Sequence, residues 1–97
     1  MAQYPIFPRQ GGDKSNLNVT AATVVKATPG TVWTVNVTTA GSAPGTVHDV
    51  ATTGAAAAAN LVAEIPNTVG TYTLTFPCLT GIVVTPGTGQ VVSVAYS

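Results

Sequence analysis

The clearest pattern along the chain is a strict alternation of polar and apolar residues in the segment 71–76. Threonines at every second position alternate there with Tyr72, Leu74 and Phe76. Successive side chains of an extended strand point to opposite faces. The pattern therefore predicts a half-buried strand whose three large side chains face the core.

Two other segments show the same alternation. Residues 33–38 place Trp33, Val35 and Val37 on one face, and residues 92–96 form a third strand near the C-terminus. We expect Trp33 to pack in the core with the two valines. Weaker strand candidates, all rich in the β-branched residues Val and Thr, are residues 19–26, 45–52, 61–65 and 81–85.

Three Pro-Gly-Thr segments, residues 29–31, 44–46 and 86–88, lie between these strands. Proline presets φ for the second position of a turn, and glycine accepts the positive φ of the third position in a type II turn. Short strands between such turns predict an all-β fold, either a small β-sandwich or a jelly-roll-like module.

The alanine-rich run at residues 54–60 does not fit the β pattern. It is the best helix-forming stretch of the chain, but it is long enough for at most two turns, which are unstable alone. We expect at most one short helix here. It either packs across one end of the domain or is replaced by a low-profile loop.

The N-terminal segment differs from the rest of the chain. Residues 1–16 contain two prolines, two adjacent glycines and half of all the charges, without strand or helix periodicity. We therefore divide the chain into an extended N-terminal arm, residues 1–16, and a single β domain, residues 17–97. The first residues do not resemble a secretory signal, which indicates a protein made in a cytoplasm.

Four side chains of the arm are candidate inter-subunit contacts: Tyr4, Ile6, Phe7 and Arg9. The three large apolar side chains are the natural anchors of an extended segment. Such an arm either folds back on its own domain or docks on a neighbouring subunit. We expect it to dock on a neighbour.

Charge is scarce throughout the chain. Only 6% of the 97 residues are charged and the net charge is zero, whereas roughly 25% is usual for a globular domain. Seventeen threonines supply much of the remaining polarity. Such a surface has no long-range field for nucleic acid, and it is easily desolvated. The composition therefore predicts contact with other protein, and it gives no support for binding to nucleic acid or a membrane.

Few residues are arranged for catalysis. His48 and Asp49 are adjacent, but neighbours on a strand point to opposite faces and make a poor catalytic pair. Asp49 and Glu64 would meet only through tertiary structure. A single cysteine, Cys78, excludes an intrachain disulfide and a structural zinc site, and we expect it to be buried and inert. We therefore expect no enzymatic activity, no cofactor and no metal.

The aromatic residues allow one alternative. Trp33, Tyr72 and Tyr96 are candidates for a platform that stacks on sugar rings. Each lies on the apolar side of an alternating segment, so core packing is the role we expect.

The span from about residue 18 to residue 97, most clearly from 67–72 through 83–91, resembles short, threonine-rich β proteins from the structural-gene clusters of tailed bacteriophages. The resemblance implies a non-enzymatic virion protein, made in the bacterial host and present in many copies or as a homo-oligomer. It implies a capsid decoration or cement protein that bridges subunits of the major capsid protein or other virion proteins. The alternative is a tail or head-fibre component, or a carbohydrate-binding module, that contacts a host-surface sugar.

Overall fold

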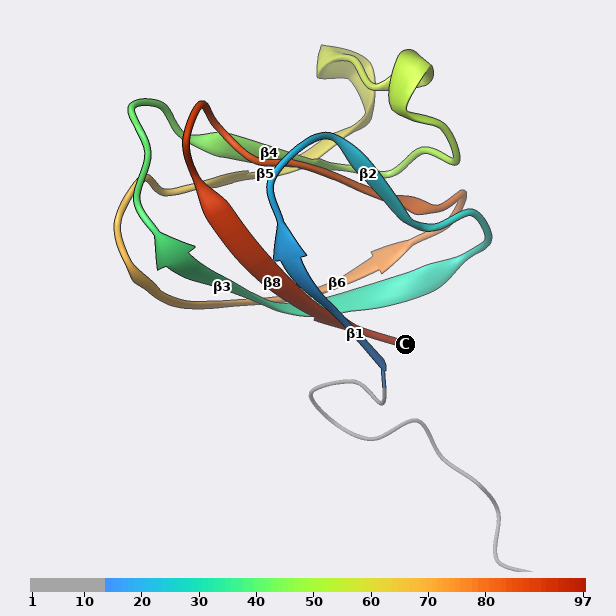
Figure 1. Cartoon of the computed structure of the whole chain (residues 1–97). Coiled ribbons are helices and arrows are strands. Elements are labelled where there is room, and N and C mark those ends of the chain that lie inside the picture. The colour runs from blue at the N-terminus through green and yellow to red at the C-terminus, as the bar shows by residue number, and fades with distance from the viewer. Residues whose placement is uncertain (1–13) are drawn as a thin grey trace, which may run out of the picture.

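The computed structural model describes residues 14–97, which fold into two antiparallel four-stranded sheets (Figure 1). Sheet A contains, in spatial order, β1 (Lys14–Val19), β8 (Val91–Tyr96), β3 (Gly30–Thr39) and β6 (Gly70–Cys78). Sheet B contains β2 (Thr23–Lys26), β7 (Ile82–Thr85), β4 (Gly45–His48) and β5 (Leu61–Ile65). The all-β prediction is confirmed.

The strand order is that of a jelly roll. Strand β1 pairs with β8, β2 with β7, β3 with β6 and β4 with β5, all antiparallel. This is the pairing of one long hairpin, formed by the first four strands and the last four, rolled up into two sheets. Eight strands in such an arrangement define the jelly roll. The sequence predicts a small β-sandwich or a jelly-roll-like module, and the strand order matches the jelly roll.

Valines from both sheets fill the core. Strand β6 follows its sequence pattern: its threonines are exposed, and Tyr72 and Leu74 pack against the buried cluster. Phe76 faces the same side, opposite Val32, but it lies on an edge strand and is 43% exposed. The buried cluster itself consists of Val19, Val32, Val35, Val37, Val47, Ile65, Cys78, Ile82, Val84, Val92 and Val94.

Strand β3 departs from the predicted alternation, and the expectation that Trp33 is a core residue is wrong. Val32 pairs with Tyr96 of β8, and Thr34 pairs with Ala95, so β3 has one residue more than β8 over this interval. Such an extra residue is a β-bulge, which changes the face to which the following side chains point. Val32 is completely buried, and Trp33 lies outside the core cluster.

The Pro-Gly-Thr segments do not contain the predicted type II turns. Within residues 14–97, only Gly89 among the glycines has a positive φ. Gly30 and Gly45 instead begin strands β3 and β4. A Cβ atom on Gly45 would lie 2.6 Å from Oε1 of Gln90, so this glycine is required by close packing rather than by backbone conformation.

The alanine-rich run forms two isolated 3₁₀ turns, Thr53–Ala55 and Ala58–Asn60, which project above sheet B (Figure 1). Each turn is three residues long. The run is thus a loop with helical turns, in keeping with the low stability of such a short helix.

Candidate interaction surfaces

The predicted contact residues of the arm, Tyr4, Ile6, Phe7 and Arg9, lie outside the described residues. The surfaces below are therefore built from residues 14–97 alone. Four charged side chains belong to this part of the chain: Lys14, Lys26, Asp49 and Glu64.

Asp49 fixes the connection between β6 and β7. Its Oδ1 accepts hydrogen bonds from the backbone N–H groups of Thr80 (2.8 Å) and Gly81 (3.2 Å), and its Oδ2 accepts one from Leu79 (3.0 Å). Burial by itself raises the pKa of Asp49, but these three hydrogen bonds outweigh it, and the pKa lies below its ordinary value. The Asp49 carboxylate thus links two segments about thirty residues apart, and both of its oxygens accept hydrogen bonds from backbone N–H groups.

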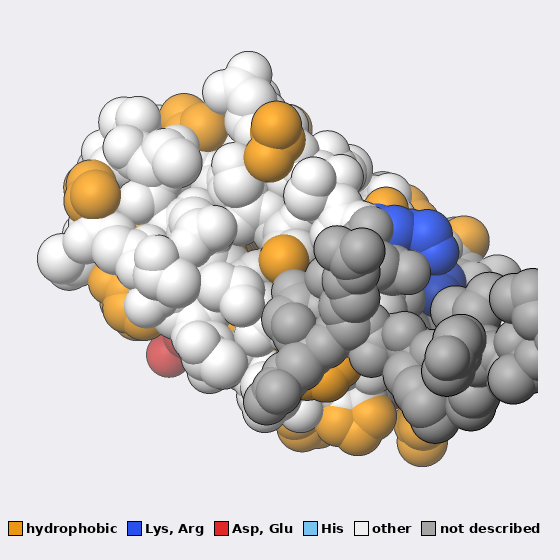
Figure 2. Space-filling model, turned by 90° about the horizontal axis from the view of Figure 1, so that it is seen from below, with side chains coloured by type: hydrophobic (Ala, Val, Ile, Leu, Met, Phe, Trp, Pro, Cys, Tyr) orange, Lys and Arg blue, Asp and Glu red, His pale blue; other side chains and the backbone are white. Residues whose placement is uncertain are grey.

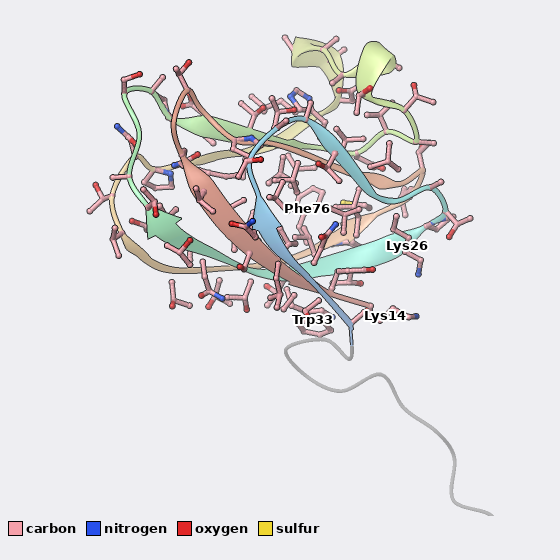
Figure 3. The ribbon with its side chains drawn as sticks, in the orientation of Figure 1. Lys14, Lys26, Trp33 and Phe76 are labelled. Carbon is pink, nitrogen blue, oxygen red and sulfur yellow. The ribbon has the colours of Figure 1, made fainter. Side chains whose placement is uncertain are left out.

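Three large apolar side chains lie exposed at this end of the sandwich, which we call the Asp49 end. Leu79 is 77% exposed, although its N–H group is held by Asp49. Phe76 is 43% exposed, close to the end of edge strand β6, and faces the gap between the sheets (Figure 3). Leu61 is 44% exposed and pairs with His48, the neighbour of Asp49. Exposed apolar side chains at one end of a domain make that end a candidate interaction surface.

His48 anchors the alanine-rich run to β4. Its Nδ1 donates to Oδ1 of Asn60 (2.9 Å), and in the neutral ring its Nε2 accepts from the hydroxyl of Thr46 (3.1 Å). Asn60 also bonds two backbone groups of the alanine-rich run. These contacts bury His48 and leave both ring nitrogens occupied by structural partners.

Side-chain amides hold the loops at the opposite end of the sandwich. Asn67 accepts from the N–H of Gly41 and donates to its carbonyl, both at 2.7 Å. Gln90, which is 1% exposed, accepts from the N–H of Gly87 (3.1 Å) and donates to the carbonyl of Pro66 (3.0 Å). Three loops at this end, those between β3 and β4, β5 and β6, and β7 and β8, are therefore joined by neutral hydrogen bonds.

The outer face of sheet A carries Trp33. The indole lies on the side of sheet A away from sheet B (Figure 3), and its Nε1–H donates to Oγ of Ser97 (3.0 Å). Tyr72 and Tyr96 pack against the core instead. The three aromatics considered as a platform are therefore not on one surface, and Trp33 alone of them faces outward.

Cys78 is buried at the end of β6, as expected. Burial raises the pKa of its thiol to about 11, and the negative charge of Asp49 adds to this effect. A thiol of this kind is a poor nucleophile at neutral pH.

Within residues 14–97 there is no pocket and no group of three or more His, Cys, Asp or Glu side chains that could hold a metal ion. The helical segments of the described residues are too short to span a membrane. No protein-family model, no curated protein and no solved structure matches the chain.

Proposed function

We propose that this chain is a non-enzymatic structural protein of a bacteriophage virion, which decorates the capsid and bridges its subunits. The observation that carries the proposal is the exposed apolar group Leu61, Phe76 and Leu79 at the Asp49 end, in a domain that has almost no charge. Burial of apolar surface drives protein association, and a neutral surface loses little hydration when it is covered. Contacts of this kind should depend little on salt.

The Asp49 hydrogen bonds make this group suitable for docking. Leu79 lies on a connection whose N–H groups are held in place before any partner binds. A preorganised anchor loses less conformational entropy on binding than a free loop. When many copies bind to one shell, each copy needs only a modest interface.

Two further observations support a virion role. The strand order is that of a jelly roll, a fold used by viral capsid domains among others, although fold analogy alone does not assign function. The threonine-rich sequence resembles phage structural proteins. Within the proposal, the arm residues Tyr4, Ile6, Phe7 and Arg9 make a second contact with a neighbouring subunit.

The test is incorporation into purified phage particles, with copy number measured by quantitative mass spectrometry. We expect hundreds of copies per particle for a decoration protein. Leu79→Ser should greatly reduce incorporation, whereas Val69→Ser should not, because Val69 is 60% exposed but lies at the opposite end. Deletion of residues 1–12 should also reduce incorporation and leave the domain folded. Absence of the protein from particles, or equal incorporation of the two serine variants, would contradict the proposal.

A further inference from the structure

We infer that the outer face of sheet A is a binding surface for an uncharged glycan, with Trp33 as the stacking platform. This inference is independent of the capsid-binding role, because it uses a different surface. It rests on the position of Trp33, on the side chains that surround it, and on the distribution of charge.

The β-bulge of β3 is what brings Trp33 to this face. Val32 turns into the core, Trp33 points outward, and Thr34 follows on the outer side. The hydrogen bond from Nε1 to Ser97 restricts the indole to one orientation. An aromatic ring that is fixed before binding presents its electron-rich face to the C–H groups of a sugar ring at little entropic cost.

Small neutral side chains, all polar except Ala95, form rows across the sheet beside the indole. The register aligns one outward row over all four strands, and a second row over three strands lies two residues further along. The rows are about 7 Å apart, and the longer row spans about 14 Å. The first row is Ser15, Ala95, Thr34 and Thr73, and the second is Ser93, Asn36 and Thr71.

These rows supply what sugar hydroxyls need. A hydroxyl both donates and accepts hydrogen bonds, and so do the Ser and Thr hydroxyls and the Asn amide. The face is also shallow, because the small side chains rise little above the strands. It therefore suits a glycan laid along the sheet rather than a compact molecule that requires a pocket.

One lysine is too little charge to recognise an acidic glycan by ion pairs, so recognition on this face rests on neutral hydrogen bonds and stacking. The described acidic residues belong elsewhere, with Asp49 after β4 and Glu64 on β5. Lys14 lies at the start of β1 and is the one charged side chain of sheet A within residues 14–97. In the part of this view that the grey residues do not cover, Figure 2 shows mainly uncharged atoms, with basic side chains toward one end and an acidic side chain at the opposite edge.

The same composition argues against a second copy of the chain as the occupant. The cores of protein interfaces are enriched in aromatic and apolar groups. Here the large apolar side chains are Trp33 and Leu17, which is 69% exposed, and the two rows consist of hydroxyl side chains, one amide and the small apolar side chain of Ala95. The polar groups of such a face would be poorly paired against an identical face, whereas sugar hydroxyls pair with them.

Tryptophan fluorescence tests the inference directly, because Trp33 is the only tryptophan of the chain. The full chain is titrated with maltohexaose, cellohexaose, mannohexaose and chitohexaose to about 10 mM, which covers weak binding. We expect at least one of these sugars to shift or quench the emission. An oligogalacturonate of the same length, which is acidic, should bind no better. If none of the four neutral sugars binds, or if only the acidic one does, the inference is wrong.

Variants then locate the site by isothermal titration calorimetry. Trp33→Ala should weaken binding at least about tenfold, as expected for loss of one stacked ring, and Trp33→Phe should restore most of it. Thr34→Val should weaken binding, and Thr80→Val, a matched exposed threonine at the Asp49 end, should not. Circular dichroism melts must show each variant folded. Unchanged sugar affinity in folded Trp33→Ala would overturn the inference, and so would a dimer that depends on Trp33 and is unaffected by sugar.

Discussion

The carboxylate of Asp49 offers the sharpest test of how the Asp49 end is held together. Asp49→Ala removes the acceptor of three backbone N–H groups at 2.8, 3.0 and 3.2 Å. Hydrogen bonds to a charged group contribute about 1.5–3 kcal/mol each when buried, but this connection is partly exposed, so water replaces much of what is lost. The loss of a helix-capping side chain, the nearest measured analogue, costs about 0.5–2 kcal/mol. We expect Asp49→Ala to lower the free energy of unfolding by about 1–2 kcal/mol.

Asp49→Asn separates geometry from charge. The amide oxygen can take the place of Oδ1, which accepts from Thr80 and Gly81, whereas the amide nitrogen replaces Oδ2, which accepts from Leu79. Two of the three hydrogen bonds are thus retained without their charge. The loss should be smaller than for alanine. Glu64→Gln is the matched control, since Glu64 is an exposed carboxylate on edge strand β5, and we expect a change within about 0.5 kcal/mol.

The pH dependence gives a second, independent readout. Because the pKa of Asp49 in the folded state lies below its ordinary value of 3.8, ionisation stabilises the folded state above that value. This contribution disappears as the pH falls through the folded-state pKa. The difference in stability between the native chain and Asp49→Asn should therefore be constant near neutral pH and shrink below pH 3.8.

Thermal melts measure all three variants. A loss of 1 kcal/mol corresponds to a decrease in Tm of roughly 4–8 °C for a domain of this size, so Asp49→Ala should melt measurably lower than the control. If Asp49→Ala were as stable as Glu64→Gln, or if the difference for Asp49→Asn stayed constant to low pH, the anchor described here would be wrong.

Two other predictions concern buried groups. Gln90→Ala should cost about 1–3 kcal/mol for each of the two backbone partners left unpaired, Gly87 and Pro66; a urea midpoint within error of the native one would contradict this. Cys78 should resist a thiol reagent at pH 8 in the folded protein, because its pKa is raised to about 11, and should react once the chain is unfolded in urea. Rapid labelling of the native protein would show that the thiol is accessible.

The sequence predicts the fold class well because alternation reports directly on burial. In β6 the exposed threonines and the core-facing Tyr72 and Leu74 follow the pattern of the sequence. The jelly-roll strand order rests on long-range pairing such as that of β1 with β8. Local patterns do not contain that information, which is why two architectures stayed open.

Strand β3 shows where alternation fails. The counting that placed Trp33 with Val35 and Val37 assumes a regular strand, and one extra residue at the bulge moves Trp33 to the other face. The adjacent residue Val32 is a clue in the sequence. In a regular strand Val32 and Trp33 would lie on opposite faces, so one of these two large apolar side chains would have to point outward. The alternating pattern alone thus predicts a core position for Trp33, whereas its side chain is partly buried on the outer face.

The hydrogen-bonding roles of Asp49 and His48 cannot be predicted from the sequence for a related reason. The two residues are neighbours in the sequence, but the hydrogen-bond partners of Asp49 begin at Leu79, and those of His48 are Thr46 and Asn60. Backbone N–H groups have no signature in the sequence, so a carboxylate that binds them cannot be distinguished from one that is free for chemistry. The scarcity of charge can be read from the sequence, but the partners of each carboxylate cannot.

The two proposed surfaces share no residue, and this makes them separable by experiment. The backbone of Leu79 is held by Asp49, which follows β4 of sheet B, whereas Trp33 is on the outer face of sheet A. A chain that holds a particle through the first surface would leave the second free to face a glycan. Leu79→Ser should then lose incorporation into particles and keep its affinity for sugar. Trp33→Ala should lose its affinity for sugar and keep incorporation into particles. If each substitution abolished both properties in folded protein, a single continuous interface would have to replace the two surfaces.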